Sequence, residues 1–353
     1  MASARNPNAS PHAINLATTT LVDPQTNETL FVGVRHGIHS ASGLTGIART
    51  NANQNRAAES VTAALLSNQA VFQQALTNAR PGGNGQAVDL DIVSLSLVTP
   101  TFDLLWGEST LWEDQLAAWN HINANSPHTI QVWDPGAPPH IAQLRNVTVN
   151  VRVIPMNWGV NPGAMFGVGW WDVGETNRAA LRHLLGGLSP HDQISGLAGD
   201  FLAGGASAQD KQIVRELVEQ IRDIWAAGTY KSDADNDIYK MTSRLALLAH
   251  KIGATPMWNC KSGKDRTGHL DAEAKFLAAE IHYSGHVPPY GQLSDVRKNQ
   301  FKEFALHSGN LEIQRYNTGL AGYKTFNMEA NVERLGDPAA TARYTGGGAF
   351  VEH

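Results

Sequence analysis

Cysteine is almost absent from this chain of 353 residues, since Cys260 is the only one. The composition therefore excludes a disulfide framework within the chain and a zinc site built from several cysteines. The longest apolar stretches are far too short to cross a bilayer, and the N-terminus lacks the apolar core of a cleaved secretory signal. There is no HExxH motif, and Gly263-Lys264 lacks the upstream glycine of a nucleotide-binding P-loop. These absences argue against disulfide-rich, zinc-protease and P-loop proteins.

Positive charge is also scarce, because 27 Lys and Arg are outnumbered by 32 Asp and Glu and the formal net charge is −5. That balance argues against a nucleic-acid partner. An anionic substrate would have to meet a local basic patch, and residues 251–275 contain five basic side chains against three acidic ones. The 14 histidines show no spacing typical of a metal site. We therefore expect neither a metal nor a cofactor.

The basic patch contains a recognisable loop. Five residues separate Cys260 from Arg266 in the segment Cys-Lys-Ser-Gly-Lys-Asp-Arg-Thr-Gly. An arc of this length can wrap one phosphate with successive backbone N–H groups, and a helix starting near Thr267 would add its positive N-terminal end. The spacing and its basic surroundings favour a phosphate-binding loop over a buried cysteine in an ordinary turn. The residues expected to bind phosphate are Lys261, Ser262, Gly263, Lys264 and Gly268.

The chemistry of such a loop gives a role to three residues. Cys260, as a thiolate, would attack phosphorus and form a phosphocysteine that water then hydrolyses. Arg266 would bind two phosphate oxygens with its planar guanidinium and stabilise the charge that develops in the transition state. Thr267 could donate a hydrogen bond to the cysteine sulfur, or it could cap the following helix.

The general acid that protonates the leaving oxygen has two candidates. Asp265 stands inside the loop, immediately before Arg266. Asp172, in Trp170-Trp171-Asp172-Val173-Gly174, could instead close over the site on a mobile segment, or it could be a carboxylate near a helix N-terminus. We expect Asp265 to be the acid and keep Asp172 as the alternative.

Two lysines and three further polar residues bear on the substrate. Lys261 and Lys264 would neutralise phosphates on neighbouring carbons of a polyphosphorylated ring, where a charge pair is worth a few kcal/mol at an effective dielectric of about 20. A phosphoprotein has no such need, although two solvated lysines on a turn would show the same pattern. Asn157 and Asn161 could hydrogen-bond ring hydroxyls or hold a turn. Arg35, near a predicted strand end, could contact a second phosphate.

Three separated segments share their pattern with one family. They are the cysteine loop followed by Asp271-Ala272-Glu273, the run Asn157-Trp158-Gly159-Val160-Asn161, and Ser308–Gln314 with Asn317-Thr318-Gly319. They resemble the SopB/IpgD family of bacterial inositol phosphate and phosphoinositide phosphatases, which is related to eukaryotic inositol polyphosphate 4-phosphatases. That family usually has Asn-Phe-Gly-Val-Asn-Glu in the second segment, so Trp158 and Pro162 depart from its pattern.

The resemblance implies a biological setting. Members of this family are type III effectors that a bacterium secretes into a host cell, where they act in the cytoplasm and at membrane surfaces on host phosphoinositide signalling. The implied partners are the substrate, a host membrane contacted peripherally, and a secretion chaperone. Those effectors carry a long N-terminal region that engages host small GTPases and membranes, and we expect this chain to have little room for one.

The order of apolar patterns predicts an α/β fold. We expect a mixed central sheet of the cysteine-phosphatase kind, flanked by helices, with an additional helical layer over about 174–251. Strands are predicted at 14–22 and 30–35, which form a hairpin, and at 88–98, 147–155 and 256–259. Helices are predicted at 56–78, 111–120, 175–186, 209–226, 237–251 and 267–283. Residues 1–12 and 346–353 are expected to be flexible ends of one phosphatase domain over 13–345.

The sequence thus predicts a metal-independent phosphatase acting on phosphomonoesters of inositol polyphosphates or phosphoinositides. Three alternatives stay open: a phosphotransferase in which another alcohol replaces water, a protein tyrosine phosphatase, and an inactive phosphoinositide-binding module. The lysines in the loop argue against the second. The intact set of Cys260, Arg266 and Thr267 argues against the third.

Overall fold

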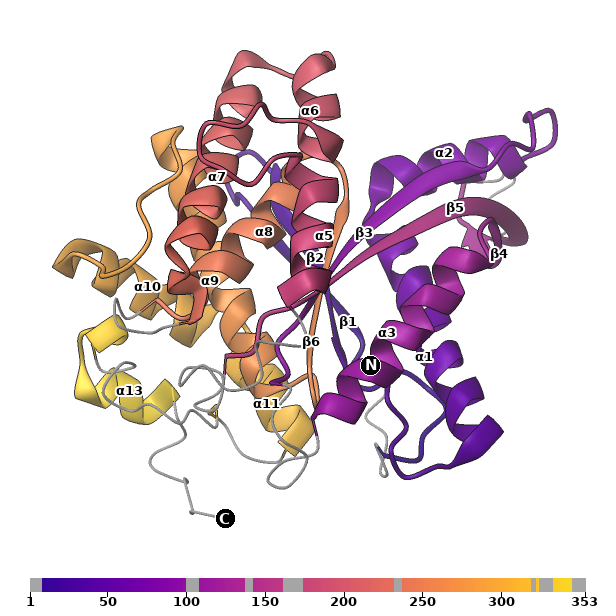
Figure 1. Cartoon of the computed structure of the whole chain (residues 1–353), viewed down its shortest axis with the longest axis horizontal. Helices are drawn as coiled ribbons and strands as arrows, with labels where there is room; N and C mark the ends of the chain where they lie inside the picture. The colour runs from indigo at the N-terminus through magenta and orange to yellow at the C-terminus, as the bar shows by residue number, and fades with distance from the viewer. Residues whose placement is uncertain are drawn as a thin grey trace.

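The computed structural model describes residues 8–99, 108–136, 142–160, 174–231, 237–318, 322–323 and 333–344. In these ranges one sheet of six strands runs through the molecule in the order β1-β2-β6-β3-β5-β4 (Figure 1). The strands are β1 (Ala17–Val22), β2 (Thr29–Gly37), β3 (Val88–Ser96), β4 (His128–Asp134), β5 (Gln143–Asn157) and β6 (Thr255–Cys260). Helices cover both faces of this mixed sheet, so the predicted α/β class is confirmed.

The four central strands are parallel. β2, β6, β3 and β5 pair in parallel, and β1 and β4 add antiparallel edges. β6 is buried along its whole length and β3 along most of it, because helices cover both faces of these central strands. β1 and β2 form the predicted hairpin. Because the four central strands are parallel, their carboxyl ends lie at one edge of the sheet.

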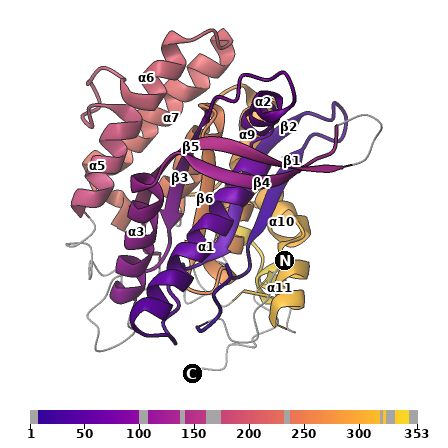
Figure 2. The same cartoon turned by 90° about the vertical axis from the view of Figure 1, so that its right-hand side faces the viewer.

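Helices form layers on the two faces of the sheet (Figure 2). One face carries α1 (Gly46–Ser67), α2 (Gln69–Ala79) and α3 (Ser109–Ala124). The other face carries α5 (Gly174–Leu185), α8 (Lys240–Lys251) and α9 (Asp265–Ser284), with α6 (Gly196–Ala203), α7 (Ala208–Ala227) and the short 3-10 turn η1 (Thr229–Lys231) packed outside them. The helices α5 to α8 form the additional helical layer that the sequence predicts.

The core of this layer follows helical spacing. Ile213, Leu217 and Ile221 repeat every four residues along α7 and are buried. Arg222 beside them is buried too, and its guanidinium donates to the backbone carbonyls of Leu185 and Gly187. A single arginine thus binds α7 to the end of α5.

Several predicted elements differ from the structure in detail. The residues predicted as one helix over 56–78 are helical except Asn68, and they belong to two helices, α1 and α2. Asn68 leaves the helical conformation, and its side chain caps α2 by accepting from the Val71 N–H. β4 and α6 are missing from the prediction, because two residues of β4 and one of α6 are buried and mark no clear apolar face. α9 begins at Asp265, two residues before the predicted start, so Asp265 and Arg266 are already helical.

The C-terminal elements pack beside α9. They are α10 (Asp295–His307), α11 (Asn310–Thr318) and α13 (Pro338–Tyr344). Phe301, Leu311 and Tyr323 bury against Ala272 and Phe276 of α9 in a core of their own. Most of the predicted flexible ends lies outside the described residues, so the predicted domain bounds stay a prediction. None of the described helices is long and apolar enough to cross a membrane.

Candidate active site

Cys260 is the last residue of β6, at the edge where the parallel strands end. It is 2% exposed and lies in register with Gly37 at the end of β2. After Lys264 the chain enters α9, so the structure has the order strand, loop, helix that the phosphate-binding chemistry requires. The indole Nε1 of Trp258 donates to the Thr267 carbonyl at 3.0 Å, which fastens the first turn of α9 to β6.

Contacts near β2 determine the direction of the loop's peptide groups. The Lys261 carbonyl accepts from the Ile38 N–H at 3.3 Å, and the Ser262 carbonyl accepts from the Asn15 Nδ2 at 2.7 Å. In a trans peptide the N–H points opposite to the C=O. The N–H groups of Ser262 and Gly263 therefore point away from these donors, which is the arrangement that an anion-binding nest needs.

Gly263 satisfies both a conformational and a spatial requirement of the loop. Its φ of +68° lies in the left-handed region that favours glycine. A Cβ built at this position would lie 2.6 Å from the Gly37 nitrogen and from the His36 carbonyl carbon. Gly268 is similarly confined, since its Cβ would lie 2.5 Å from the Tyr323 ring. Both glycines are therefore needed for the loop and α9 to pack this closely.

Arg266 is held by a carboxylate that the sequence analysis did not find. Glu108, just before α3, contacts it through both oxygens, with Nη2–Oε1 at 2.9 Å and Nη1–Oε2 at 3.3 Å. Arg266 Nη1 also donates to the Leu97 carbonyl at 2.7 Å, and Glu108 accepts from the Thr99 N–H. Burial disfavours the charged guanidinium, but Glu108 and the Cys260 sulfur outweigh it and raise the pKa of Arg266 above its usual value. No local motif marks Glu108, because it stands 158 residues from Arg266.

The first turn of α9 holds two further predicted residues. Thr267 is fully buried, and its hydroxyl donates to the Lys264 carbonyl at 2.9 Å. Asp265 is half-buried, and its Oδ1 accepts from the Gln314 Nε2 at 2.5 Å. The structure thus places both side chains beside the loop, while the sulfur contact of Thr267 and the acid role of Asp265 stay predictions.

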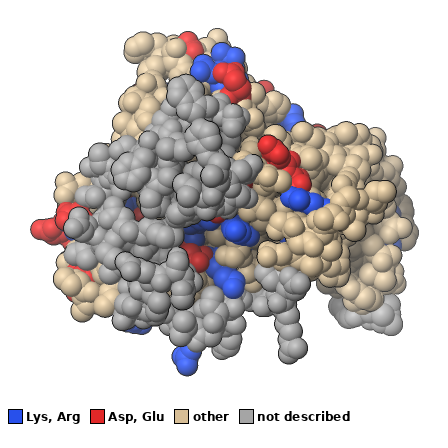
Figure 3. Space-filling view, turned by 60° about the horizontal axis from the view of Figure 1, so that its bottom comes forward, with Lys and Arg blue, Asp and Glu red and all other residues tan. Residues whose placement is uncertain are grey.

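The two loop lysines differ in their exposure. Lys261 is exposed and Lys264 is half-buried, both beyond the end of β6. Figure 3 shows the molecule with this end of the sheet turned forward, and Lys and Arg side chains lie near the middle of that face with acidic groups among them. Positive charge is therefore available at the surface of a protein whose net charge is negative.

Arg35 is buried, with 4% of its side chain exposed. Its Nη1 donates to the Asn310 Oδ1 and lies 3.9 Å from the Asp271 Oδ2. Asp271 also pairs with Lys275 at 3.0 Å. These contacts join β2, α9 and α11, so Arg35 has a structural partner, and its predicted contact with phosphate stays a prediction.

Asn157 ends β5 and is brought to the same edge as the cysteine loop. It lies in register with Ser96 of β3, which lies in register with Asn259 of β6. Its backbone exchanges two hydrogen bonds with the Asn177 side chain, at 2.8 Å and 2.6 Å. The Asn157 side chain is fully buried, and neither of its polar atoms has a partner among the described residues. Its contact with a substrate stays a prediction.

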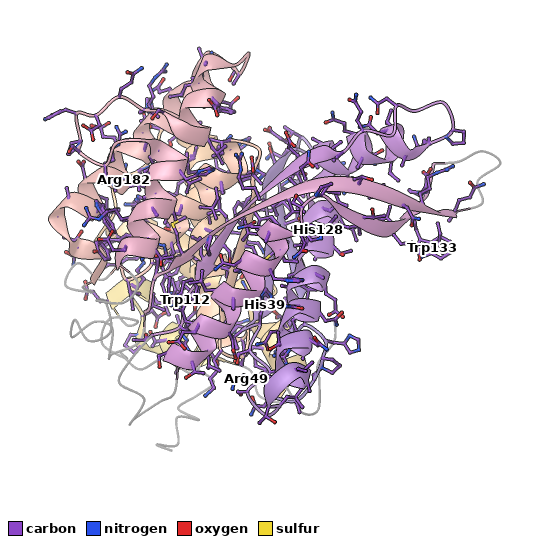
Figure 4. All side chains as sticks on the ribbon, turned by 45° about the vertical axis from the view of Figure 1, so that its right-hand side comes forward. His39, Arg49, Trp112, His128, Trp133 and Arg182 are labelled. Carbon is purple, nitrogen blue, oxygen red and sulfur yellow. The ribbon has the colours of Figure 1, made fainter. Side chains whose placement is uncertain are left out.

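Two buried histidines lie next to the loop, beneath α1 and α3. His36 and His39 stack with their ring centroids 4.3 Å apart, and Figure 4 shows His39 between these two helices. His39 Nε2 lies 2.9 Å from the Ser60 hydroxyl of α1. The backbone N–H of His39 donates to the Gln115 Oε1 of α3. Burial lowers the pKa of His36 to about 4, although its hydrogen bond to the Gly37 carbonyl opposes the shift. His36 is therefore neutral near pH 7 and unsuited to proton transfer there.

The described ranges contain no group of three or more His, Cys, Asp or Glu placed to hold a metal ion. Two predicted residues, Asn161 and the alternative acid Asp172, lie outside these ranges, and their roles stay predictions. The described residues do bring together a buried thiol, a guanidinium, a carboxyl group and a ring of peptide groups at one helix N-terminus.

This combination defines an α/β protein in which a loop with a buried cysteine joins a parallel strand to a helix. The crystal structure of a Legionella phosphoinositide phosphatase, SidF, matches with a TM-score of 0.62 over 94% of this chain and 68% of that one, at 9% identity. A second structure, of a novel Legionella phosphoinositide phosphatase, matches with a TM-score of 0.59 over 93% of this chain and 65% of that one, at 10% identity. At such low identity the likeness shows the fold.

The sequence comparison identifies the family. The family model described as enterobacterial virulence protein IpgD matches residues 2–339, and the chain belongs to this family, as predicted. It is 36% identical over 358 residues to the inositol phosphate phosphatase IpgD of Shigella flexneri, covering 96% of this chain but 63% of that protein. It is 37% identical over 337 residues to the inositol phosphate phosphatase SopB of Salmonella bongori, covering 92% of this chain and 76% of that protein.

Replacing Gly263 with alanine should damage the loop more than conformational strain alone would. Gly253 is the matched control, because its φ is +83° and a Cβ there meets no atom within 4 Å. We expect Gly253→Ala to cost about 1–2 kcal/mol of unfolding free energy, and Gly263→Ala to cost more and to weaken phosphate binding, measured by thermal unfolding and phosphate titration. Equal effects would mean that packing against β2 is unimportant.

Glu108→Gln should impair the site while keeping its shape. The change leaves Arg266 without its opposite charge, and breaking a buried ion pair costs about 3–5 kcal/mol. We expect kcat/KM to fall by about 10- to 100-fold if roughly half of that energy is lost in the transition state. Glu113→Gln, an exposed neighbour on α3, is the control and should have wild-type kinetics. Wild-type kinetics for Glu108→Gln would contradict the role of this ion pair.

Proposed function

We propose that this chain is a metal-independent phosphatase that removes a phosphate from an inositol ring, free or lipid-borne, through a phosphocysteine. The observation that carries the proposal is the loop that begins at the buried Cys260 thiol and ends at Arg266 on the first turn of α9. The names of its relatives, inositol phosphate phosphatases, support the substrate class.

In the first step the Cys260 thiolate attacks phosphorus opposite the ester oxygen, so the S–P bond forms as the P–O bond breaks. Arg266 and the N–H groups of Ser262 and Gly263 bind the phosphoryl oxygens, on which the transition-state charge is spread. Asp265 gives its proton to the departing ring oxygen, which leaves as the alcohol.

In the second step water attacks the phosphocysteine. Asp265, now a carboxylate, takes a proton from this water as the new O–P bond forms. The S–P bond breaks, and the Thr267 hydroxyl turns from the Lys264 carbonyl to donate its hydrogen bond to the departing sulfur of Cys260. The products are inorganic phosphate and the enzyme in its starting state, with the proton back on Asp265.

The substrate preference rests on Lys261 and Lys264. A ring that carries several phosphates presents negative charge beside the scissile group, and ammonium groups at the rim of the loop would offset it. A phosphotyrosine side chain carries no second phosphate and would gain little from them. This difference supports a polyphosphorylated inositol as the substrate.

The setting we propose is a bacterial effector. The description of the family as an enterobacterial virulence protein supports secretion into a host cell, with action on phosphoinositide signalling in the cytoplasm and at membrane surfaces. Peripheral contact with a host membrane and a secretion chaperone complete the proposed partners. The chain spans about 63% of the length of the Shigella flexneri relative.

Cys260→Ser should abolish turnover and retain phosphate binding. Serine keeps the loop but is a far poorer nucleophile near neutral pH, and loss of a sole nucleophile lowers kcat by orders of magnitude. Phosphate release from inositol polyphosphates and phosphoinositides measures the first property, and titration with inorganic phosphate measures the second. A variant that keeps more than about a tenth of the wild-type rate would rule out the covalent mechanism.

Replacing both Lys261 and Lys264 with alanine should affect one substrate class selectively. We expect kcat/KM for a polyphosphorylated inositol to fall by about tenfold for each 1.4 kcal/mol of lost transition-state stabilisation. A small aryl phosphate has no second phosphate to contact, so its kcat/KM should fall much less. The ratio of the two losses cancels general damage to the loop. Equal losses would mean that the lysines stabilise the shape of the loop and do not contact the other phosphates of the inositol ring.

A further inference from the structure

α11 reaches the catalytic loop through one buried side chain. Gln314 is 3% exposed, and its Nε2 donates to the Oδ1 of Asp265 at 2.5 Å. Asp265 is the first residue of α9 and immediately precedes Arg266. A residue that stands 49 positions later in the chain therefore contacts the side chain to which the proposed function assigns the general acid.

Asn310 forms a second bond of the same kind from the same helix. Its Nδ2 donates to the Asp271 Oδ2 at 2.6 Å, and its Oδ1 accepts from Arg35. Asn310 and Gln314 are four residues apart, so they lie on one face of α11. That face packs against α9, and two amide–carboxylate bonds determine how the helices sit together. The position of Gln314 is therefore well defined.

The bond from Gln314 restricts the orientation of the Asp265 carboxyl group. The terminal torsion of an aspartate is broad in an unconstrained side chain, and a donor held at Oδ1 narrows it. Orientation matters here, because a general acid must come within about 2.6–3.2 Å of the oxygen that it protonates.

We propose that Gln314 is a positioning residue that holds the Asp265 carboxyl group in the orientation from which it protonates the leaving oxygen. This inference rests on the proposed function, in which Asp265 is the general acid. Asn310 has the same chemistry but contacts α9 six residues further along and accepts from Arg35 of β2, so it serves the docking of α11. The segment Ser308–Gln314 thereby contributes to the reaction from outside the loop.

The test compares two substrates with different leaving groups. An inositol polyphosphate leaves as a ring alcohol and needs the proton, whereas nitrophenyl phosphate leaves as a stable phenolate and needs little help. Gln314→Leu removes the N–H at similar volume. We expect kcat/KM for the inositol substrate to fall by about 10- to 100-fold, part of the roughly 10²- to 10⁴-fold that a general acid contributes. For nitrophenyl phosphate the fall should be less than about threefold.

Two further variants separate positioning from support of the fold. Asn310→Leu removes the bonds to Asp271 and Arg35 from the same face of α11 but leaves the one to Asp265. It should therefore lower both activities by the same factor. In an Asp265→Asn background, Gln314→Leu should add no loss selective for the inositol substrate, because there is no proton left to direct. If Gln314→Leu does not fold, Gln314→Asn keeps the amide but is one methylene shorter, and it should show the same selective loss.

Equal losses on the two substrates with Gln314→Leu, or an unchanged rate on the inositol substrate, would overturn the positioning role. A selective loss in Asn310→Leu as large as that in Gln314→Leu would overturn it as well. A different result would show that the proposed function itself is wrong, because Cys260→Ser would then retain turnover. An Asp265→Asn variant without substrate selectivity would show that another group is the acid, and it would overturn the role of Gln314 too.

Discussion

The loop after Cys260 has to gather N–H groups and a guanidinium around one point while lying partly inside the protein. Such an arrangement is unfavourable by itself, because like-oriented dipoles and a cation repel one another and buried polar groups without partners cost free energy. Groups from other parts of the chain compensate: Glu108 pairs with Arg266, and donors at Asn15 and Ile38 bind the loop carbonyls. The segment before α3 therefore belongs to the site, although the reaction uses no side chain from it.

The same dependence on distant partners continues along α9. Asp265, Asp271 and Glu273 each bind a side chain that follows α9 in the sequence, and these partners are Gln314, Asn310 and Arg334. Burial alone would raise the pKa of Glu273, but Arg334 and His269 outweigh it and lower that pKa below its usual value. Removing one member of such a pair leaves an uncompensated buried charge. The orientation of the catalytic helix is thus tied to the C-terminal segment.

The parallel sheet explains why residues so far apart in the chain meet at all. β2, β6, β3 and β5 end at one edge, with Gly37 beside Cys260, Asn259 beside Ser96, and Ser96 beside Asn157. The antiparallel strand β4 pairs with the N-terminal half of β5. Figure 4 shows Trp133 near the far end of this two-stranded ribbon. The segments that contain the candidate site residues lie at the carboxyl ends of the parallel strands, which is the usual place for a site in an open α/β sheet.

Local sequence was enough to identify the loop, because the features that mark it all lie within about ten residues. These features are its length, its glycine and the charge of the neighbouring residues. The strand before it and the helix after it follow from equally local apolar patterns, as do the buried positions of α7. The break at Asn68 and the edge strand β4 were not predicted. A single capping side chain leaves no periodic signal, and only two of the seven residues of β4 are buried.

The partners of the loop could not be found in this way. Glu108 stands 158 residues from Arg266, and Asn310 stands 275 residues from Arg35, so no spacing rule connects them. Arg35 illustrates the difference: the sequence shows a cation at a strand end, and only the packing of α9 and α11 against β2 reveals that Asp271 and Asn310 already bind it. Short-range spacing specifies which atoms can react, whereas charge compensation inside the protein depends on contacts that exist only after the chain has folded.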